Sequence, residues 1–281
     1  MSYLRIIILT TLAMIAFAGN SLLCRAALKH TAIDAASFTS IRLISGALIL
    51  WLVVNISRKT QTGRGNWLSA LALFAYAAGF SFAYVSLPAA TGALLLFGAV
   101  QATMIGHGIR VGERLHGLQL VGLVLALAGL VGLLLPGLFS APPVTGSVLM
   151  LGAGVAWGIY SLRGKKIGGD PTRVTAGNFL RAVPVAAALS LLMMDRTSLD
   201  SAGVGYAVAS GALASGIGYS IWYTALPVLK AAKAATVQLS VPVIAALGGI
   251  VFLGEPLTMR LIFSSVAILG GIALVILEKR A

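Results

Sequence analysis

Charged residues are scarce in this sequence: they make up 10% of its 281 residues, whereas hydrophobic residues make up 59%. A soluble domain is usually about a quarter charged, so this chain has too few charges to cover a surface in water. We infer that most of its surface faces lipid. At ~20 residues per crossing, ten crossings would use ~200 residues and leave only short loops. The composition therefore excludes a separate soluble domain.

Cysteine, histidine and acidic residues are also few, which limits the available chemistry. The single cysteine, Cys24, excludes an intrachain disulfide and is expected to pack as a small hydrophobe. The three histidines and seven acids show no metal-ligand spacing and no catalytic cluster within the apolar runs. We therefore expect no metal, no cofactor and no catalytic residue. The alternative of an intramembrane enzyme that acts on lipid would require such a cluster.

Basic residues outnumber acidic ones and give a net charge of +13. A basic chain can indicate nucleic-acid binding. Here Lys and Arg are scattered between apolar runs, as positive-inside topology requires. With the N-terminus placed in the cytoplasm, fourteen Lys and Arg fall on the cytoplasmic side and four on the other. We therefore expect both termini inside the cell and no nucleic-acid partner.

Long apolar runs follow one another along the whole chain. They must form helices, because lipid cannot satisfy exposed backbone groups and the runs are too long and unalternating for barrel strands. The expected spans are residues 4–23, 35–56, 66–86, 90–109, 116–135, 146–162, 173–194, 202–224, 231–252 and 258–277. The predicted fold is an all-α membrane protein with ten transmembrane helices.

An internal repeat relates the two halves of the chain. A shift of 139 residues aligns Arg42 with Arg181, and beyond residue 88 a shift of 142 aligns Gly112-Glu113 with Gly254-Glu255. The matches run in order over nearly the whole length, which is hard to produce by chance in an apolar sequence. The repeat therefore indicates a duplicated unit.

The halves are expected to lie upside down relative to each other. We assign residues 1–137 to the first repeat and residues 138–281 to the second. Five spans in each repeat make the second one start on the opposite side of the membrane. Inverted repeats are the usual construction of secondary transporters, with a substrate site near the midplane between them. A scaffold without transport activity is the alternative.

Two short signatures resemble those of a known family. Gly112-Glu113-x-Leu115 and Gly254-Glu255-Pro256-Leu257 each precede a Gly-rich final helix, and Ala156-Trp157-Gly158 lies in the sixth span. The repeats resemble EamA-type repeats of the drug/metabolite transporter superfamily over residues 5–135 and 146–277. The first half departs from this pattern, because Ala18 stands where the second half has Trp157.

The resemblance implies a multi-pass protein of the bacterial inner membrane that exports small metabolites by alternating access. Amino acids, aromatic ones included, or similar amphipathic compounds are the expected cargo, and a drug or nucleotide-sugar carrier of the same fold is the alternative. The expected partners are this small-molecule substrate and the lipid bilayer. The Gly-rich fifth and tenth spans predict close helix packing, and we expect a monomer or a weak homodimer.

Aromatic side chains recur on one face of the third span and at the equivalent positions of the eighth. Phe80 and its repeat mate Tyr219 lie well inside their spans. Aromatic faces with hydroxyl tips suit flat or amphipathic substrates. Tyr84, Tyr223 and Trp222 lie nearer the helix ends, and we interpret them as interfacial anchors.

Two arginines lie inside expected spans, where an arginine that faces lipid costs roughly +2.5–3.5 kcal/mol on insertion scales. Arg42 has Thr39 one turn away, and its repeat mate Arg181 has Asn178 one turn away. Either arginine could attract a substrate carboxylate or could snorkel to the interface. The sequence leaves both interpretations open.

Uncharged polar residues within the spans should not face lipid, because an unpaired amide there costs several kcal/mol. They could bind substrate or join helices, and we favour a cavity position for Gln101 and Gln238. The candidate substrate-binding residues are Asn20, Phe80, Phe97, Gln101, Trp157, Tyr160, Asn178, Arg181, Tyr219 and Gln238.

Overall fold

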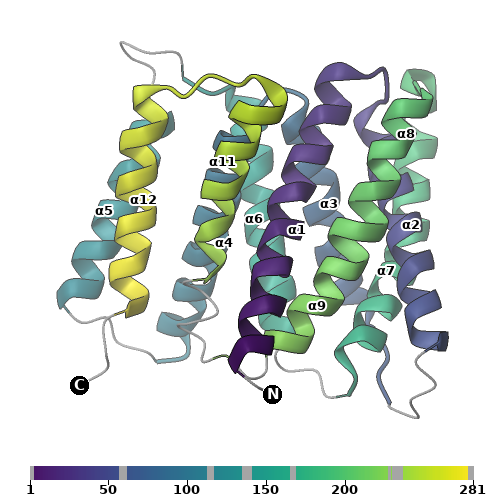
Figure 1. The fold of residues 1–281 in the computed structure, drawn as a ribbon, viewed down its shortest axis with the longest axis horizontal. Helices are drawn as coiled ribbons and strands as arrows, with labels where there is room; N and C mark the ends of the chain where they lie inside the picture. Colours follow the sequence, from purple (N-terminus) through teal and green to yellow (C-terminus); the bar gives the residue numbers. More distant parts are fainter. Residues whose placement is uncertain are drawn as a thin grey trace.

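The computed structural model describes residues 3–56, 62–112, 117–134, 141–164, 169–226, 229 and 237–277. In this part of the chain every regular element is a helix, which confirms the predicted all-α class. Seven helices are long and apolar enough to span a membrane, and three shorter apolar helices accompany them. The helices lie side by side along a common direction (Figure 1).

The long helices come from both halves of the chain. They are α1 (Tyr3–His30), α2 (Ala35–Ile56), α3 (Trp67–Tyr84), α4 (Ala89–Arg110), α6 (Val144–Gly164), α7 (Pro171–Leu192) and one continuous rod made of α8 (Ser201–Val208), η2 (Ala209–Ile217) and α9 (Gly218–Ala225). The shorter helices are α5 (Gly117–Leu134), α11 (Ser240–Leu253) and α12 (Met259–Leu277). A 3₁₀ turn, η1 (Met194–Arg196), follows α7.

One helix end differs from the sequence prediction by several residues, and one predicted helix start is not described. Helix α1 continues to His30 rather than ending at residue 23, because the charged side chains of Arg25 and Lys29 find partners at the end of the bundle. The predicted span 231–252 overlaps α11, but residues 231–236 lie outside the described residues. The ten-span topology with both termini inside stays a prediction.

The chain begins and ends at the same end of the bundle. Helix α1 starts there and α12 finishes there (Figure 1). We call this the terminal end. The opposite end carries Arg25, Glu255 and the turn between α3 and α4, and we call it the distal end.

Equivalent helices of the two halves run in opposite directions. Helix α1 starts at the terminal end (Figure 1). Helix α6 starts at the distal end, where Gly146 packs against Ser86 and Leu87 of the α3–α4 turn. The boundary between the repeats at residues 137 and 138 lies outside the described residues, so the proposed division stays a prediction.

The interior is formed chiefly by α1, α2, α3, α4, α6, α7 and the α8–α9 rod, with small residues and aromatic rings filling it. Helices α5 and α12 pack against each other at one edge and reach the rest of the bundle through α4 (Figure 1). Large apolar side chains such as Leu48, Val124 and Phe263 point outward and are exposed. An outer surface of this kind suits lipid rather than water.

The middle of the α8–α9 rod is a π-helix, η2, and it packs closely on α2. A Cβ atom at Gly211 would collide with the carbonyl of Arg42 and the hydroxyl of Ser45. Glycine thus allows the two backbones to approach each other closely. Single-turn π segments are frequent at functional sites, and η2 lies next to the polar interior described below.

Acidic residues mark helix starts instead of helix middles. The carboxylates of Asp170 and Asp200 accept hydrogen bonds from Arg173 N and Gly203 N in the first turns of α7 and α8. Asp34 accepts hydrogen bonds from Ala36 N and Ser37 N at the start of α2. Such caps satisfy backbone N–H groups that the helix leaves free.

Candidate functional site

An aromatic cluster occupies the middle of the bundle, with Trp157 of α6 at its centre. The Trp157 ring lies 4.8 Å from the ring centroids of both Tyr76 and Tyr219, and 5.5 Å from that of Tyr160. Phe17 of α1 meets Trp157 edge to face at 6.1 Å. Rings from α1, α3, α6 and α9 therefore meet at one place, in the tilted and edge-on arrangements that aromatic pairs prefer.

Arg42 of α2 enters this cluster and is 1% exposed. Its Nε donates to Ser215 Oγ at 3.2 Å, and its Nη2 donates to Tyr76 Oη at 3.1 Å and to Tyr219 Oη at 3.4 Å. The guanidinium carbon lies 5.1 Å from the ring centroid of Tyr76 and 4.9 Å from that of Phe80, a cation–π arrangement. Tyrosine hydroxyls and ring faces thus surround a buried cation.

Asn20 links α1 to the same group. Its Nδ2 donates to Tyr76 Oη at 3.2 Å, and its Oδ1 accepts a hydrogen bond from Ser210 of η2 at 2.6 Å. Both Asn20 and Ser210 are buried. The polar interior therefore joins α1, α2, α3 and the π-helix through one connected set of hydrogen bonds.

The centre of the cluster is almost closed. A cavity of about 10 Å³ remains between Phe17, Asn20, Tyr76, Phe80, Leu96, Phe97, Trp157 and Tyr219. That volume admits roughly one water molecule. A metabolite could enter only if the surrounding helices or side chains moved.

A larger cavity, of about 410 Å³, lies at the terminal end. Tyr160, Asn178 and Tyr223 line it together with the ends of α6, α7 and α9. Asn178 Nδ2 donates to Tyr160 Oη at 3.4 Å. The hydroxyl of Tyr223 is buried and has no hydrogen-bond partner among the described residues. Because Tyr160 also packs on Trp157, the inner wall of this cavity is the aromatic cluster itself.

Segment 62–66 and α7 meet beside this cavity. Asn66 N donates to Asn178 Oδ1 at 2.9 Å, and Asn66 Oδ1 accepts from Arg163 Nη2 at 3.1 Å. Arg163 Nε also donates to Ser69 Oγ at 3.1 Å. These bonds hold α3, α6 and α7 together at the terminal end.

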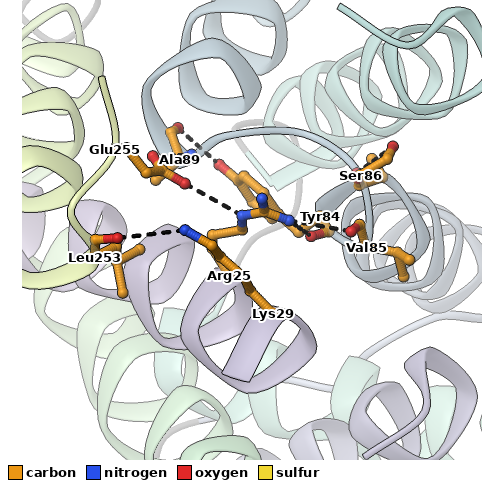
Figure 2. A network of polar contacts seen from close by, with 9 residues as sticks. Arg25, Lys29, Tyr84, Val85, Ser86, Ala89, Leu253 and Glu255 are labelled. Carbon is orange, nitrogen blue, oxygen red and sulfur yellow. Dashed lines mark hydrogen bonds and ion pairs between the residues drawn. The ribbon is translucent and has the colours of Figure 1, made fainter. Parts of the chain in front are cut away.

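The distal end is tied together by an ion pair. Arg25 Nε lies 3.2 Å from Glu255 Oε1, and the two side chains are 11% and 6% exposed. Arg25 Nη1 also donates to the carbonyls of Tyr84 and Val85 at 2.9 and 3.1 Å, while Glu255 Oε2 accepts from Ala89 N at 2.7 Å. Figure 2 shows how these contacts, with that of Lys29, join α1, the α3–α4 turn and the segment after α11.

Glu255 acts at the start of a different helix from the one that it precedes in the chain. It precedes α12 in the chain, but its carboxylate meets the first N–H group of α4. A carboxylate at this place interacts favourably with the positive end of the α4 dipole. A third cavity, of about 260 Å³, lies beside it between α4, α5, α11 and α12.

Most of the predicted site residues lie at or beside the cluster. Asn20, Phe80, Trp157, Tyr160 and Tyr219 belong to the contacts described above. Phe97 lines the small central cavity, and Asn178 lines the large one. The structure thus brings together seven of the ten predicted side chains, from six different helices.

The remaining three lie elsewhere. Arg181 is half-buried and donates to Gly177 O of its own helix at 2.8 Å, apart from the cluster. Gln101 is buried one turn beyond Phe97, and its Nε2 has no hydrogen-bond partner among the described residues. Gln238 is buried just before α11. The described contacts of Arg181 do not include the aromatic rings.

Three residues at the centre of the cluster, Phe17, Arg42 and Tyr76, are absent from the list of candidate substrate-binding residues, although the sequence left open that Arg42 attracts a substrate carboxylate. Tyr76 shares a helix face with Phe80, and its repeat mate Ser215 also contacts Arg42, so the repeat itself held the signal. The interpretation of Tyr84, Trp222 and Tyr223 as interfacial anchors was wrong, because they are 0%, 3% and 7% exposed. Their rings pack inside the bundle instead.

No group of three or more His, Cys, Asp or Glu side chains capable of holding a metal ion occurs in the described segments of the chain. The chemistry available at the cluster is therefore that of a cation, amides, hydroxyls and aromatic rings. Groups of these kinds can bind and orient a molecule. They include no base paired with a nucleophile.

Comparison with known proteins identifies the family of this chain. The profile of the EamA-like transporter family matches the chain twice, over residues 4–135 and 144–277. The chain belongs to the EamA-like transporter family. Members of this family are transporters, so this EamA-like protein is a membrane transporter of small molecules and not an enzyme.

Several known proteins are similar in sequence to this EamA-like protein. An uncharacterized protein of Pseudomonas aeruginosa is 60% identical over 276 residues, 98% of this chain and 96% of the relative. The threonine/homoserine exporter RhtA of Escherichia coli is 36% identical over 144 residues, 49% of this chain and 48% of the exporter. A probable amino-acid metabolite efflux pump of Escherichia coli is 27% identical over 199 residues, 66% of this chain and 67% of the pump.

The fold also has a counterpart among solved structures. A crystal structure superposes with a TM-score of 0.68 over 95% of this chain and 97% of that chain, at 21% sequence identity. At this identity the likeness supports the fold alone. Matches to the RhtA exporters span only about half of either chain.

Proposed function

We propose that this EamA-like transporter exports amino acids or similar small amphipathic metabolites across the bacterial inner membrane. Its two halves act as inverted five-helix repeats, residues 1–137 and 138–281, and alternate access to the central cluster. Ten spans with both ends of the chain in the cytoplasm complete the proposed topology. Transport needs no cofactor in this scheme.

The observation that carries this proposal is the position of the aromatic cluster between the two halves. Trp157 and Tyr219 of the second half meet Phe17 and Tyr76 of the first. Secondary transporters built from inverted repeats bind substrate at such an interface near the midplane. Aromatic rings with polar tips suit a molecule that is partly apolar and partly polar.

The two ends of the bundle differ in a way that fits one state of a transport cycle. At the terminal end a cavity of about 410 Å³ reaches the cluster. At the distal end the Arg25–Glu255 pair holds α1 against α4 (Figure 2). We propose that the distal network is the closed gate and that substrate enters from the terminal end.

Basic residues support the assignment of the terminal end to the cytoplasm. Arg64, Arg110, Arg163 and Arg173 lie at this end, next to helix ends or connections. An excess of Lys and Arg in connections is typical of the cytoplasmic side. The proposed direction of transport is therefore outward.

Amino acids are proposed as cargo because two relatives bear such names, a threonine/homoserine exporter and a probable amino-acid metabolite efflux pump. The cluster itself favours a substrate with an apolar or aromatic portion, because ring faces form most of its wall. Threonine, with a small polar side chain, and phenylalanine, with an aromatic one, thus represent the two extremes of the expected cargo.

Counterflow into liposomes tests the function. Purified protein is reconstituted in liposomes preloaded with unlabelled threonine, homoserine, phenylalanine or tryptophan, and uptake of the labelled form is measured against empty liposomes. We expect accumulation of at least one amino acid. Absence of counterflow for the whole panel would overturn the proposal.

A pair of tryptophan variants tests the site. Trp157→Ala removes the central ring of the cluster, and we expect counterflow to fall at least tenfold with unchanged abundance in the membrane. Trp51→Ala is the matched control, because Trp51 is 54% exposed on the outer surface, and it should leave counterflow unchanged. Equal counterflow in both variants would remove the cluster from the transport path.

A further inference from the structure

Among the described residues, the buried arginine of the cluster has no acidic partner. The described acids all lie in connections or at helix ends: Asp34, Asp170, Asp195, Asp200 and Glu255. None of these five carboxylates lies within ion-pair distance of Arg42. A guanidinium stays charged at any physiological pH. Burying an unpaired charge is strongly unfavourable. The fold therefore keeps a positive charge at its centre although this costs free energy of folding.

Hydrogen-bond donors also exceed acceptors around Arg42. Tyr76 Oη accepts from Arg42 Nη2, Asn20 Nδ2 and Tyr219 Oη, although a phenol oxygen has only two lone pairs. Arg42 Nη1 is buried and has no partner among the described residues. The group as a whole therefore offers unused N–H and O–H donors and a positive charge.

A donor-rich, positively charged group is complementary to an anion that only accepts hydrogen bonds. A carboxylate fits, because its two oxygens offer about four acceptor sites and can take a bidentate pair of bonds from a guanidinium. Three of the side chains that contact Arg42, namely Tyr76, Phe80 and Tyr219, also line the small central cavity. The charge thus lies directly behind the wall of the candidate substrate site.

The repeat mate Arg181 lacks these features. It is half-buried, and its guanidinium bonds back to Gly177 O on its own helix. No aromatic ring lies over its guanidinium in any described contact. The two arginines are equivalent in the repeat, but the described contacts place only Arg42 in the aromatic cluster.

We propose that Arg42, with the hydroxyls of Tyr76 and Tyr219 and the amide of Asn20, forms a carboxylate-binding subsite for the transported molecule. This inference rests on the proposed transport function and names the chemical group that a cargo must carry. The carboxylate supplies the missing acceptor atoms and the missing negative charge. The rest of the molecule packs on the rings of Phe17, Phe97 and Trp157. Amines and alcohols without a carboxylate are excluded.

A competition experiment on the wild-type protein tests the chemistry. Binding of labelled threonine and labelled phenylalanine to detergent-purified protein is measured with unlabelled competitors. The competitors are the parent amino acid, the des-amino acid that keeps the carboxylate (3-phenylpropionate for phenylalanine), and the carboxamide that loses it. We expect the two carboxylates to compete and the carboxamides to be at least tenfold weaker. Equal competition by the carboxamides would overturn the subsite.

Variants of the two arginines test the assignment to Arg42. Arg42→Gln should reduce amino-acid binding and counterflow at least tenfold, whereas Arg181→Gln, the matched control, should retain both. Arg42→Lys keeps the charge without the planar fork and should show an intermediate loss. Retention of wild-type binding by Arg42→Gln would overturn the proposal.

Thermal unfolding separates a binding role from a structural one. An arginine held for a ligand is not needed for folding, so Arg42→Gln should melt at or above the wild-type temperature while losing the stabilisation that added amino acid gives the wild type. A lower melting temperature in Arg42→Gln, with binding lost in proportion, would assign Arg42 a structural role and overturn the subsite.

The two proposals fail in different ways. Absence of counterflow for every amino acid in the wild type would overturn the transport proposal and with it this subsite. The wild type could instead show counterflow that survives in Arg42→Gln or that carboxamides inhibit as well as the amino acids do. Either of these results would overturn the subsite alone.

Discussion

Arg25 and Arg42 are two arginines only a few turns from the same end of the bundle, yet their surroundings differ in kind. Arg25 has a carboxylate partner, Glu255, and two backbone carbonyls as acceptors. Arg42 lies deeper and has hydroxyls and ring faces only. A charge that holds helices together is neutralised within the fold. A charge left without a counterion is one that the fold alone does not explain, and a ligand provides the explanation we propose.

The same contrast appears in the cavities around the two arginines. Around Arg25 the contacts join three separate segments (Figure 2), and the lining of the cavity beside Glu255 includes no ring of the aromatic cluster. Around Arg42 the rings leave a small central space, with a larger cavity beyond Tyr160. We therefore expect the distal end to be rigid and the side chains at the centre to rearrange around a bound substrate.

The largest stability effect is expected at the distal network. Glu255→Gln keeps an acceptor for Ala89 N but leaves the buried Arg25 without a counter-charge. Breaking one partner of a buried ion pair costs about 3–5 kcal/mol, so we expect a large drop in unfolding free energy, measured by denaturant unfolding in detergent. Asp195→Asn is the control, because Asp195 is exposed in η1 at the same end.

This result would sharpen the comparison of the two arginines if Arg42→Gln, measured in parallel, leaves the unfolding free energy unchanged. A loss below about 1 kcal/mol in Glu255→Gln, the value typical of surface pairs, would contradict the view that the distal pair holds the bundle closed.

A smaller effect is expected where η2 meets α2. Gly211→Ala places a methyl group against the carbonyl of Arg42 and the hydroxyl of Ser45. Forcing extra volume into a packed contact costs about 1–3 kcal/mol, and the displaced α2 should also shift Arg42, so counterflow should fall together with the melting temperature. Gly205→Ala, in the same rod with open space around it, should be neutral. Equal behaviour of the two variants would show that α2 and η2 do not need this close contact.

The smallest effect is expected at Asp34, in the connection between α1 and α2. Burial raises the pKa of its carboxyl group, but hydrogen bonds from Ser37, Ser198 and Ala36 outweigh this and lower the pKa below its usual value. The stabilisation is therefore fully present above the unfolded-state pKa of about 4. It is lost as the pH falls through the lowered folded-state pKa.

Asp34→Ala should accordingly lower the unfolding free energy by about 1 kcal/mol at pH 7, the usual value of a lost helix cap. At a pH below the folded-state pKa the difference between variant and wild type should shrink. Thermal melts across this pH range check the prediction. A difference that does not change with pH would show that the carboxylate charge contributes nothing there.

Much of the fold followed from composition and from run lengths. The apolar runs predicted helices close to those observed, for example 35–56 against Ala35–Ile56 for α2. Polar residues in these runs were expected to avoid lipid, and Asn20, Gln101 and Asn178 are indeed buried. These inferences succeed because lipid accepts neither a free backbone nor a free amide.

It was harder to predict which face of each helix is buried in the bundle. In a soluble protein, apolar periodicity marks the buried face, but in lipid both faces of a helix are apolar and the pattern fades. Arg42 and Arg181 therefore looked equivalent, although only Arg42 points into the bundle. Tyr84 lies at the end of α3, yet it packs inside against Phe80.

The sequence by itself determined that this protein is a duplicated bundle of membrane helices with acids kept at the helix ends, because the thickness of the bilayer and its lack of hydrogen-bonding partners leave no other arrangement for such runs. Only the tertiary structure decided which side chains meet. The close approach of α2 to the π-helix at Gly211 brings Arg42 to Tyr219 and Ser215. That contact depends on packing between distant segments, which no local sequence pattern encodes.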